Sequence, residues 1–488
     1  MKFRKFLPKI LLFLLTLVSI VALCSATWYI RKYGYTGFMS ILSTFFSPWS
    51  GCADSLTGSY LLYGLLPACV VSIVLTFTLF FIQAKFTKIE KWIPWITVAI
   101  SVICIISALS MIHFPRYVYD TFLTHSTLYE EEYVDPADVT ITFPEEKRNL
   151  VYIFLESMET SFLSEELGGG CEENLIPQLY SLAQENQNFS HNDDVGGWPT
   201  VNHATWTSAA MVSQTSGVPL SIDPTKVDLK NFRGYVPGAT TIQDILHEAG
   251  YYQALMVGSD ASYGGRKEYY QDHGVDQVYD LHTAREAGLI PDDYFVWWGF
   301  EDYRLFDYAK TELTNIAAGD QPFAFTLLTV DTHHVDGYTC TLCQNEHEEP
   351  YGNVMSCSSR QVEDFVNWLK EQDFYENTTV IICGDHPSMD NQFFRRNVDK
   401  DYERHVYNCI INAPIEATNS KNRSFTPMDM FPTALAAIGC EIEGDRLGLG
   451  TNLFSDTPTL AEEMGIDVLN REITKYSDYY YHKLLSDK

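Results

Sequence analysis

The stretch Asn149-Leu-Val-Tyr-Ile-Phe-Leu-Glu156 is a compact apolar run that ends in a carboxylate. It has the pattern of a buried strand, and it begins a region in which such strands alternate with segments of helical spacing. Further strands are expected at 252–257, 323–330, 379–383 and 405–411. Helices are expected at 176–185, 207–216, 241–249, 303–318, 360–372 and 428–438. This alternation predicts an α/β domain with a mostly parallel sheet flanked by helices.

Polar residues follow three of these expected strands directly. Glu156 follows the first, Asp331-Thr332-His333 follows 323–330, and Asp385-His386 follows 379–383. In α/β sheets functional groups gather at the carboxyl ends of the strands. Carboxylates with an imidazole suit a hard or borderline cation, so a metal site is expected at this edge. A capping glutamate and a plain turn at Gly384-Asp385-His386 remain the competing interpretations.

Thr207 opens the helix expected at 207–216. A helix N-terminus carries free N–H groups and partial positive charge, which stabilise an alkoxide and hold a phosphate or sulfate. A divalent cation would activate the hydroxyl further. Thr207 is therefore a candidate nucleophile. A simple N-cap threonine has the same local sequence, and Thr205 and Ser208 compete for the role.

Two other side chains are candidates for substrate contact. His333 could bind an oxyanion, donate a proton or ligate a metal, whereas His334 is expected to be a packed surface residue. Arg266 lies in a loop after the strand expected at 252–257, and a guanidinium there suits a phosphate. A solvated arginine is the competing interpretation.

Three apolar segments, at 10–30, 58–82 and 92–112, precede the α/β region. Each has about the 20 residues that a helix needs to cross a membrane. The first is too long for the core of a signal peptide and is interpreted as a retained anchor. We expect a membrane region at 1–112, a juxtamembrane connector at 113–147 and a soluble domain with a C-terminal tail at 148–488.

Basic residues around these segments predict the orientation of the chain in the membrane. They precede the first segment and separate the second from the third, at Lys2, Arg4, Lys5, Lys9, Lys85, Lys88 and Lys91. Only Arg31 and Lys32 form a cluster on the opposite side. The positive-inside rule then places the N-terminus in the cytoplasm and the soluble domain outside.

The chain is strongly acidic, with 63 Asp and Glu against 33 Lys and Arg and a formal charge of −30. Such a charge excludes a broad nucleic-acid-binding surface. Cys340-Thr-Leu-Cys343 and nearby Cys357 could form a disulfide or half of a zinc site. Because a second pair of cysteines at similar spacing is missing, a disulfide is favoured, with Cys383 a buried strand residue.

The assembled motifs resemble the phosphoglycerol transferases of the alkaline phosphatase/sulfatase superfamily. That group includes lipoteichoic acid synthases and the membrane enzymes that decorate periplasmic glucans, and the glucan-decorating type is the closer match. The resemblance spans about 144–455, and its best segments are 149–157, 206–220, 328–334, 382–387 and 448–453.

The resemblance implies a divalent cation held by Glu156, Thr207, Asp385 and His386. This cation is expected to be Mn²⁺, with Mg²⁺ or Zn²⁺ as alternatives. It also implies that Thr207 is the nucleophile and that His333 and Arg266 contact the glycerophosphate. Two departures stand out. Lipoteichoic acid synthases carry five membrane spans rather than three, and they have a tryptophan where this chain has Gly264.

The implied activity is transfer of glycerol phosphate from phosphatidylglycerol, a lipid donor, to a cell-envelope glycan or teichoic acid acceptor through a covalent glycerophospho-threonine. His333 would assist the proton transfers. Alternatives are a phosphoethanolamine transferase, or a phosphodiesterase or sulfatase-type hydrolase of the same superfamily. A standard sulfatase is disfavoured because Thr207 lacks the formylglycine context of those enzymes. A further alternative, from a different functional class, is a catalytically silent membrane protein that binds a glycan.

Overall fold

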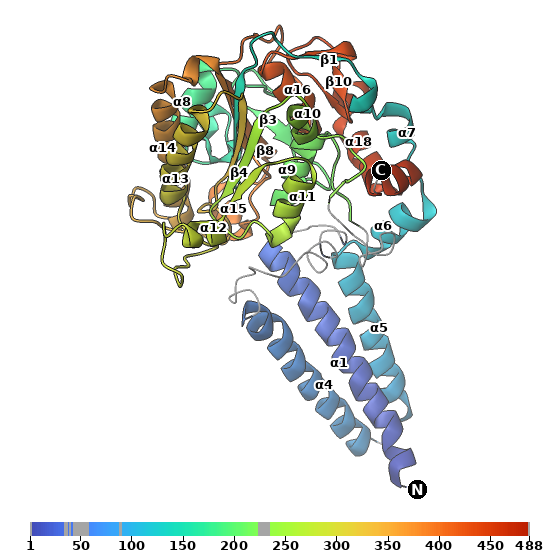
Figure 1. The fold of residues 1–488 in the computed structure, drawn as a ribbon. Helices are drawn as coiled ribbons and strands as arrows, with labels where there is room; N and C mark the ends of the chain where they lie inside the picture. Colours follow the sequence, from blue (N-terminus) through green and yellow to red (C-terminus); the bar gives the residue numbers. More distant parts are fainter. Residues whose placement is uncertain are drawn as a thin grey trace. The chain divides into compact units, whose positions relative to one another are not determined.

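The computed structural model describes residues 2–33, 38, 41, 58–86, 90–222 and 235–486 (Figure 1). These residues form two compact units, one up to Leu123 and the other from Thr124 onward. Of the basic residues used to orient the chain, Lys88 lies outside the described residues, as do the side chains of Lys2, Arg4 and Lys5.

The first unit contains three helices that are long and apolar enough to cross a membrane, at Pro8–Lys32, Gly58–Lys85 and Ile93–Met111. They lie within α1 (Lys2–Tyr33), within a π-helical turn (Leu61–Leu65) followed by α4 (Leu66–Lys85), and within α5 (Ile93–Met111). The expected three apolar helices are therefore confirmed. α1 contacts both α4 and α5, and the short α6 (Phe114–Val118) follows α5.

Small side chains line the contacts between these helices. Ala68, Ser72 and Thr76 recur every four residues on α4 and are buried, and Thr97 and Ser101 do the same on α5. Such residues allow helix backbones to approach closely, which is how helices associate in lipid. The exposed side chains of these helices are instead mostly large and apolar, so they match a hydrocarbon environment.

Seven strands form the central sheet of the second unit, in the order β3-β8-β7-β2-β6-β4-β5. Strands β7, β2, β6, β4 and β5 are parallel neighbours, whereas β8 runs antiparallel to both β7 and β3. This confirms the expected mostly parallel sheet. The strands are β2 (Asn149–Leu155), β3 (Gly197–Pro199), β4 (Tyr252–Val257), β5 (Gln277–Tyr279), β6 (Phe323–Leu328), β7 (Thr378–Gly384) and β8 (His405–Ile411).

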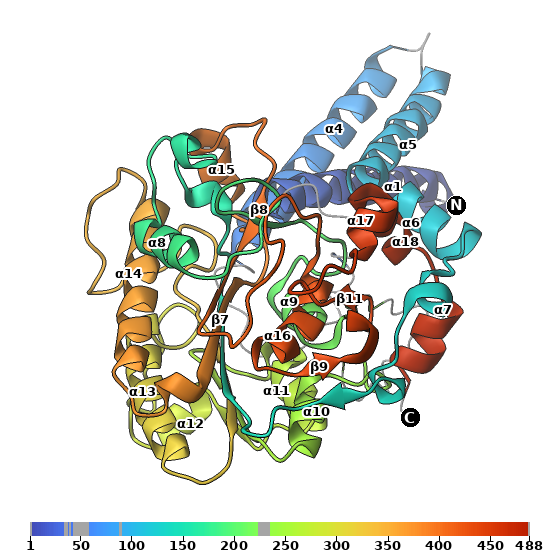
Figure 2. The ribbon, with the colours of Figure 1, turned by 90° about the horizontal axis from the view of Figure 1, so that it is seen from above.

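Helices cover both faces of this sheet (Figures 1 and 2). β2 is buried along its whole length, with Val151 and Ile153 facing one hydrophobic core and Tyr152 and Phe154 the other. The first core includes α8 (Pro177–Glu185), α12 (Leu281–Glu286), α13 (Asp302–Ala317) and α14 (Pro350–Lys370). The second includes α9 (Thr207–Ser216), α10 (Ile242–Glu248), α11 (Arg266–Asp272) and α16 (Met430–Ala437).

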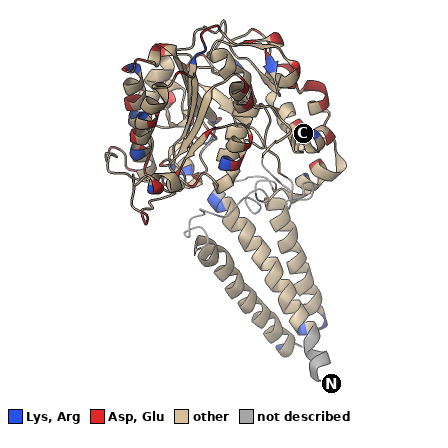
Figure 3. Cartoon of the chain, in the orientation of Figure 1, with Lys and Arg blue, Asp and Glu red and all other residues tan. Residues whose placement is uncertain are grey.

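The segment 124–147 belongs to the second unit and contributes to its hydrophobic core. Leu128 and Tyr129 of α7 (Leu128–Glu132) belong to the core, and Val134 forms a bridge with Gly448. The remaining elements are β1 (Ile141–Thr142) with β9 (Glu441–Ile442), β10 (Arg446–Leu447) with β11 (Gly450–Thr451), α15 (Asn391–Asn397), α17 (Leu460–Met464) and α18 (Ile466–Thr474). Acidic residues are spread over this unit (Figure 3).

The observed elements differ from the expected ones at a few places. α14 begins at Pro350, ten residues before the expected start at 360, because its first turns mix buried polar and small residues that hide the helical period. β6 ends at Leu328 instead of 330. The three-residue strands β3 and β5 and the short helices α11 and α12 were not expected, since they are too short to show a period.

Gly384, at the end of β7, has no room for a side chain. A Cβ there would lie 1.9 Å from the Met158 carbonyl oxygen and 2.8 Å from Val406 Cγ1. We therefore expect Gly384→Ala to destabilise the protein by about 2 kcal/mol through overpacking, measured as a lower thermal unfolding midpoint in detergent. The matched control is Gly319→Ala, whose added Cβ would approach the Ile316 carbonyl oxygen only to 3.2 Å. Equal midpoints for the two variants would contradict this packing.

Candidate active site

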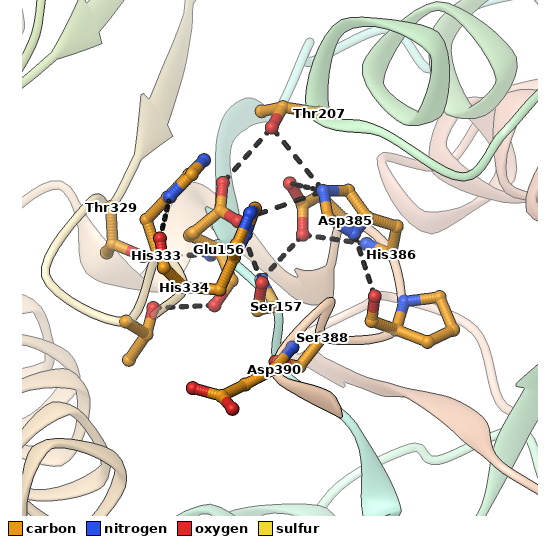
Figure 4. Close-up of polar contacts among 12 residues, drawn as sticks. Glu156, Ser157, Thr207, Thr329, His333, His334, Asp385, His386, Ser388 and Asp390 are labelled. Atoms are coloured by element: carbon orange, nitrogen blue, oxygen red, sulfur yellow. Dashed lines mark hydrogen bonds and ion pairs between the residues drawn. The ribbon is translucent and has the colours of Figure 1, made fainter. Parts of the chain in front are cut away.

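The candidate site lies where β2 and β7 end. Glu156 directly follows β2 and Asp385 directly follows β7, and the two strands pair along their whole length up to Leu155 and Gly384. Thr207 begins α9 after Trp206, which has extended backbone angles. Figure 4 shows the Thr207 hydroxyl directed toward Glu156 and His386. Residues distant in sequence therefore meet at one edge of the sheet, as the strand-end pattern predicted.

The distances among these groups are short. Thr207 Oγ1 donates to Glu156 Oε2 at 3.1 Å and lies 3.5 Å from His386 Nε2. His386 Nε2 is 3.4 Å from Asp385 Oδ2 and 3.7 Å from Glu156 Oε1. Glu156, Asp385 and His386 are at most 2% exposed, and each offers a ligand atom within 4.8 Å of the others. One cation could contact all of them at once.

Hydrogen bonds orient each of these side chains (Figure 4). The backbone N–H groups of Ser157 and His386 both donate to Asp385 Oδ1 at 2.7 Å. Asp385 Oδ2 is left with no hydrogen-bond partner among the described residues, although it is buried. His386 Nδ1 lies 3.0 Å from the Pro387 carbonyl oxygen, which places a proton on Nδ1 and leaves Nε2 as a lone-pair donor.

The electrostatics of the cluster favour a positive ion. Burial, together with the charge of Glu156, raises the pKa of Asp385 to about 7. Burial alone would lower the pKa of His386, but the Asp385 and Glu156 carboxylates raise it. Two buried carboxylates, one of which has an unpartnered oxygen, and an imidazole nitrogen form a donor set that fits a divalent cation such as Mn²⁺, Zn²⁺ or Mg²⁺.

The burial of Glu156 alone would raise its pKa. The nearby His333 and His386, with hydrogen bonds from Ser157 and Thr207, lower it instead. Glu156 is thus the carboxylate of the pair that stays ionised more readily. Ser157 supports this arrangement by donating its hydroxyl to Glu156 Oε1 at 2.8 Å, from a left-handed backbone conformation with φ of 58°.

Several supporting residues were not found from the sequence. Thr329 Oγ1 accepts the Glu156 N–H at 3.0 Å, and Thr332 Oγ1 donates to the Glu156 carbonyl at 2.6 Å. Gln214 of α9 donates to the Gly384 carbonyl at 3.2 Å. The buried Glu159 pairs with Arg404 and accepts the Ser388 N–H. Their position just beyond apolar strands could have drawn attention to some of these polar residues. The groups to which they bond are far away in the sequence, so the contacts themselves could not be predicted.

His333 follows β6 on a firmly held loop. The Asp302 carboxylate accepts the N–H groups of Val330 and Asp331 at 2.7 and 3.0 Å. His333 Nδ1 lies 2.8 Å from the His334 carbonyl oxygen, which leaves Nε2 available. Burial lowers the pKa of His333, partly opposed by Glu156. His334 is half-buried and stacks on His333, with ring centroids 4.5 Å apart.

Arg266 is the first residue of α11 and is only 6% exposed, so it is not the solvated arginine that the sequence left open. Its Nη2 donates to Ser259 Oγ and to the Asp260 carbonyl. Its Nε has no hydrogen-bond partner among the described residues. Burial lowers the pKa of Arg266, whereas Tyr263 and Glu156 raise it. The guanidinium therefore interacts electrostatically with the Glu156 carboxylate of the candidate site. A buried cation with an unused donor can bind an anion.

Gly264 packs against the start of α9. Its φ is +66°, and a Cβ there would lie 2.6 Å from Ser208 Oγ and 3.5 Å from the Trp206 ring. The space beside this glycine is filled by Ser208 and Trp206, so a side chain at this position would clash with the start of α9. Ser208 is itself 3% exposed.

Comparison with known families gives one match over most of the second unit. The sulfatase family model matches residues 148–440. Phosphoglycerol transferase I of Xanthomonas axonopodis pv. citri (strain 306) is 27% identical over 361 residues, which cover 70% of this chain and 49% of that protein. Phosphoglycerol transferase I of Salmonella choleraesuis (strain SC-B67) is 28% identical over 330 residues, covering 66% and 41%. The chain spans about half the length of the curated relatives it matches. These matches confirm the resemblance drawn from the motifs.

Two solved structures share the fold. The lipoteichoic acid synthase LtaP from Listeria monocytogenes has a TM-score of 0.50 at 18% identity and covers 65% of this chain and 79% of its own. The lipooligosaccharide phosphoethanolamine transferase A (EptA) from Neisseria meningitidis, an integral membrane protein, has a TM-score of 0.50 at 13% identity and covers 89% and 84%.

Cation affinity of the centre should depend on pH. Below about pH 7 the carboxyl of Asp385 holds a proton that must leave before the oxygen can ligate, and a protonated His386 must also lose its proton. We expect the affinity for Mn²⁺ to fall, as the pH drops below that pKa, by up to about tenfold per pH unit for each proton that the cation displaces. Titration of free Mn²⁺ followed by electron paramagnetic resonance measures this affinity.

The variant Asp385→Asn should bind Mn²⁺ weakly and lose much of this pH dependence. The matched control, Asp320→Asn, replaces an exposed carboxylate and should behave as the wild type. Affinity that rises as the pH falls would contradict the assignment of these side chains to a cation site.

Proposed function

Since the chain belongs to the sulfatase family, we propose that it is a membrane-anchored, metal-dependent phosphoglycerol transferase with Thr207 as its nucleophile. The observation that carries the proposal is the placement of a hydroxyl at a helix N-terminus, 3.1 Å from Glu156 Oε2 and 3.5 Å from His386 Nε2. The likeness to phosphoglycerol transferase I supports the choice of the transferred group.

Glu156, Thr207, Asp385 and His386 would hold the cation, which we propose to be Mn²⁺. Bound there, the cation would supply Lewis-acid activation of the threonine hydroxyl and of the phosphate. The chain itself contributes the rest. The free N–H groups at the start of α9 would donate to the phosphate oxygens. The hydrogen bonds to Asp385 Oδ1 fix the carboxylate before substrate arrives.

The reaction would proceed in two displacements at phosphorus. In the first, Thr207 Oγ1 forms a bond to the phosphorus of phosphatidylglycerol, the bond to the diacylglycerol oxygen breaks, and that oxygen takes up a proton. In the second, a hydroxyl of the acceptor attacks the glycerophospho-threonine and Thr207 regains its proton. Splitting the transfer in this way is the usual advantage of a covalent intermediate.

His333 and Arg266 are the proposed substrate contacts. With Nδ1 engaged by the His334 carbonyl, His333 Nε2 is the atom that would relay protons between Thr207 and the leaving or attacking oxygen. Its lowered pKa keeps the ring neutral at physiological pH, which suits the role of proton acceptor. The unused Nε–H of Arg266 would bind a non-bridging phosphate oxygen.

The proposal also covers location and partners. Residues 1–112 would form the membrane region, 113–147 the connector and 148–488 the catalytic domain outside the cell membrane. Apolar helices fit a lipid donor, because phosphatidylglycerol resides in the bilayer. The acceptor would be a cell-envelope glycan or teichoic acid, since a hydroxyl-rich polymer supplies the attacking oxygen of the second step.

The intact mass of the detergent-purified protein, incubated with Mn²⁺ and phosphatidylglycerol, tests this function. We expect a glycerophosphate increment and released diacylglycerol for the wild type and neither for Thr207→Ala. The matched control is Thr205→Ala, which removes a neighbouring hydroxyl and should keep the increment. Adduct formation by Thr207→Ala would refute the nucleophile. An increment only with phosphatidylethanolamine would instead identify a phosphoethanolamine transferase.

A further inference from the structure

The structure brings together three cysteines outside the candidate active site. Cys340 and Cys343 lie in the loop between β6 and α14, and Cys357 lies on α14. Cys340 Sγ is 3.7 Å from Cys343 Sγ and 3.8 Å from Cys357 Sγ, and the three are unbonded. Among the residues that the structure describes, this is one of two groups of side chains able to hold a metal ion.

The spacing of the sulfur atoms fits ligands of one tetrahedral cation. Around Zn²⁺ with Zn–S distances of about 2.3 Å, neighbouring sulfurs are about 3.8 Å apart. Cys340 meets this spacing with both partners at once. A disulfide, which the sequence favoured, would use only two of the three thiols, and Cys340 is nearly equidistant from Cys343 and Cys357. A metal site uses all three.

The surroundings also suit thiolates. Cys340 is 6% exposed and Cys357 is 2% exposed, and Gln361 Nε2 donates to Cys357 Sγ at 3.3 Å. A donor aimed at a buried sulfur stabilises its negative charge. The Cys343 N–H donates to the Cys340 carbonyl at 3.2 Å, which closes a turn that puts both sulfurs on one side. Cys343 is half-buried, so solvent reaches the cluster on the side of this residue.

We propose that Cys340, Cys343 and Cys357 bind one thiophilic divalent cation, with Zn²⁺ as the natural occupant, separately from the cation of the active site. The ion joins the loop after β6 to α14. The same helix carries Tyr351, whose hydroxyl donates to the Thr332 carbonyl and contacts Ser388 Oγ. The site thereby stabilises the loop that bears His333, and it contributes no ligand to Glu156, Asp385 or His386.

Cobalt substitution of the full-length protein in detergent distinguishes this site from the active site. Three thiolates on Co²⁺ give an intense sulfur-to-cobalt charge-transfer absorption, which oxygen and nitrogen ligands cannot give. We expect this absorption in the wild type and its loss in Cys340→Ser and Cys343→Ser. One equivalent of Zn²⁺ should also remove it, because Zn²⁺ outcompetes Co²⁺.

The matched control is Cys440→Ser, which replaces a cysteine of the same 6% exposure outside the cluster and should retain the absorption. No charge-transfer absorption in the reduced wild type, or undiminished absorption in Cys340→Ser, would overturn the proposal. Protein purified without reductant that lacks zinc and has two alkylatable thiols fewer than expected would also overturn it, in favour of a disulfide. None of these results depends on transferase activity, so the proposed function is tested separately.

Discussion

Strands β2 and β7 run parallel and in register, with Leu155 opposite Gly384, so that Glu156 and Asp385 leave the sheet side by side. Two carboxylates brought together in a buried place repel each other, and burial adds to the cost of their charges. His386 offsets part of this repulsion, and Asp385 Oδ2 still has no hydrogen-bond partner among the described residues. The pairing of β2 with β7 therefore concentrates negative charge at one place, and a bound cation would compensate that charge.

The elements around this pair act as its frame. The threonine hydroxyls beyond β6 hold the backbone of Glu156, and Gln214 of α9 holds the end of β7, so the helix that presents Thr207 is tied to the strand that presents Asp385. Preorganisation of this kind lets a site act without rearranging as charge develops. The end of β7 also approaches Met158 and Val406 closely, and for this reason Gly384 tolerates no side chain.

Long apolar runs made much of this architecture predictable. β2, β4 and β8 have the bounds expected from the sequence, and α9 begins at Thr207 as expected, because each signal is local. The strand-end rule also predicted that Glu156, Asp385 and His386 would meet. Contacts between distant segments, such as those of Thr329 and Gln214, could not be predicted from the sequence. The polar start of α14 could not be predicted either. The roles of the site residues stay predictions.

The most direct test of the central claim is anomalous diffraction at the manganese absorption edge, from crystals of the protein grown with Mn²⁺. The account predicts an anomalous peak within bonding distance of Glu156, Asp385 Oδ2, His386 Nε2 and Thr207 Oγ1. A manganese ion bound elsewhere while these four groups keep their present contacts would contradict it.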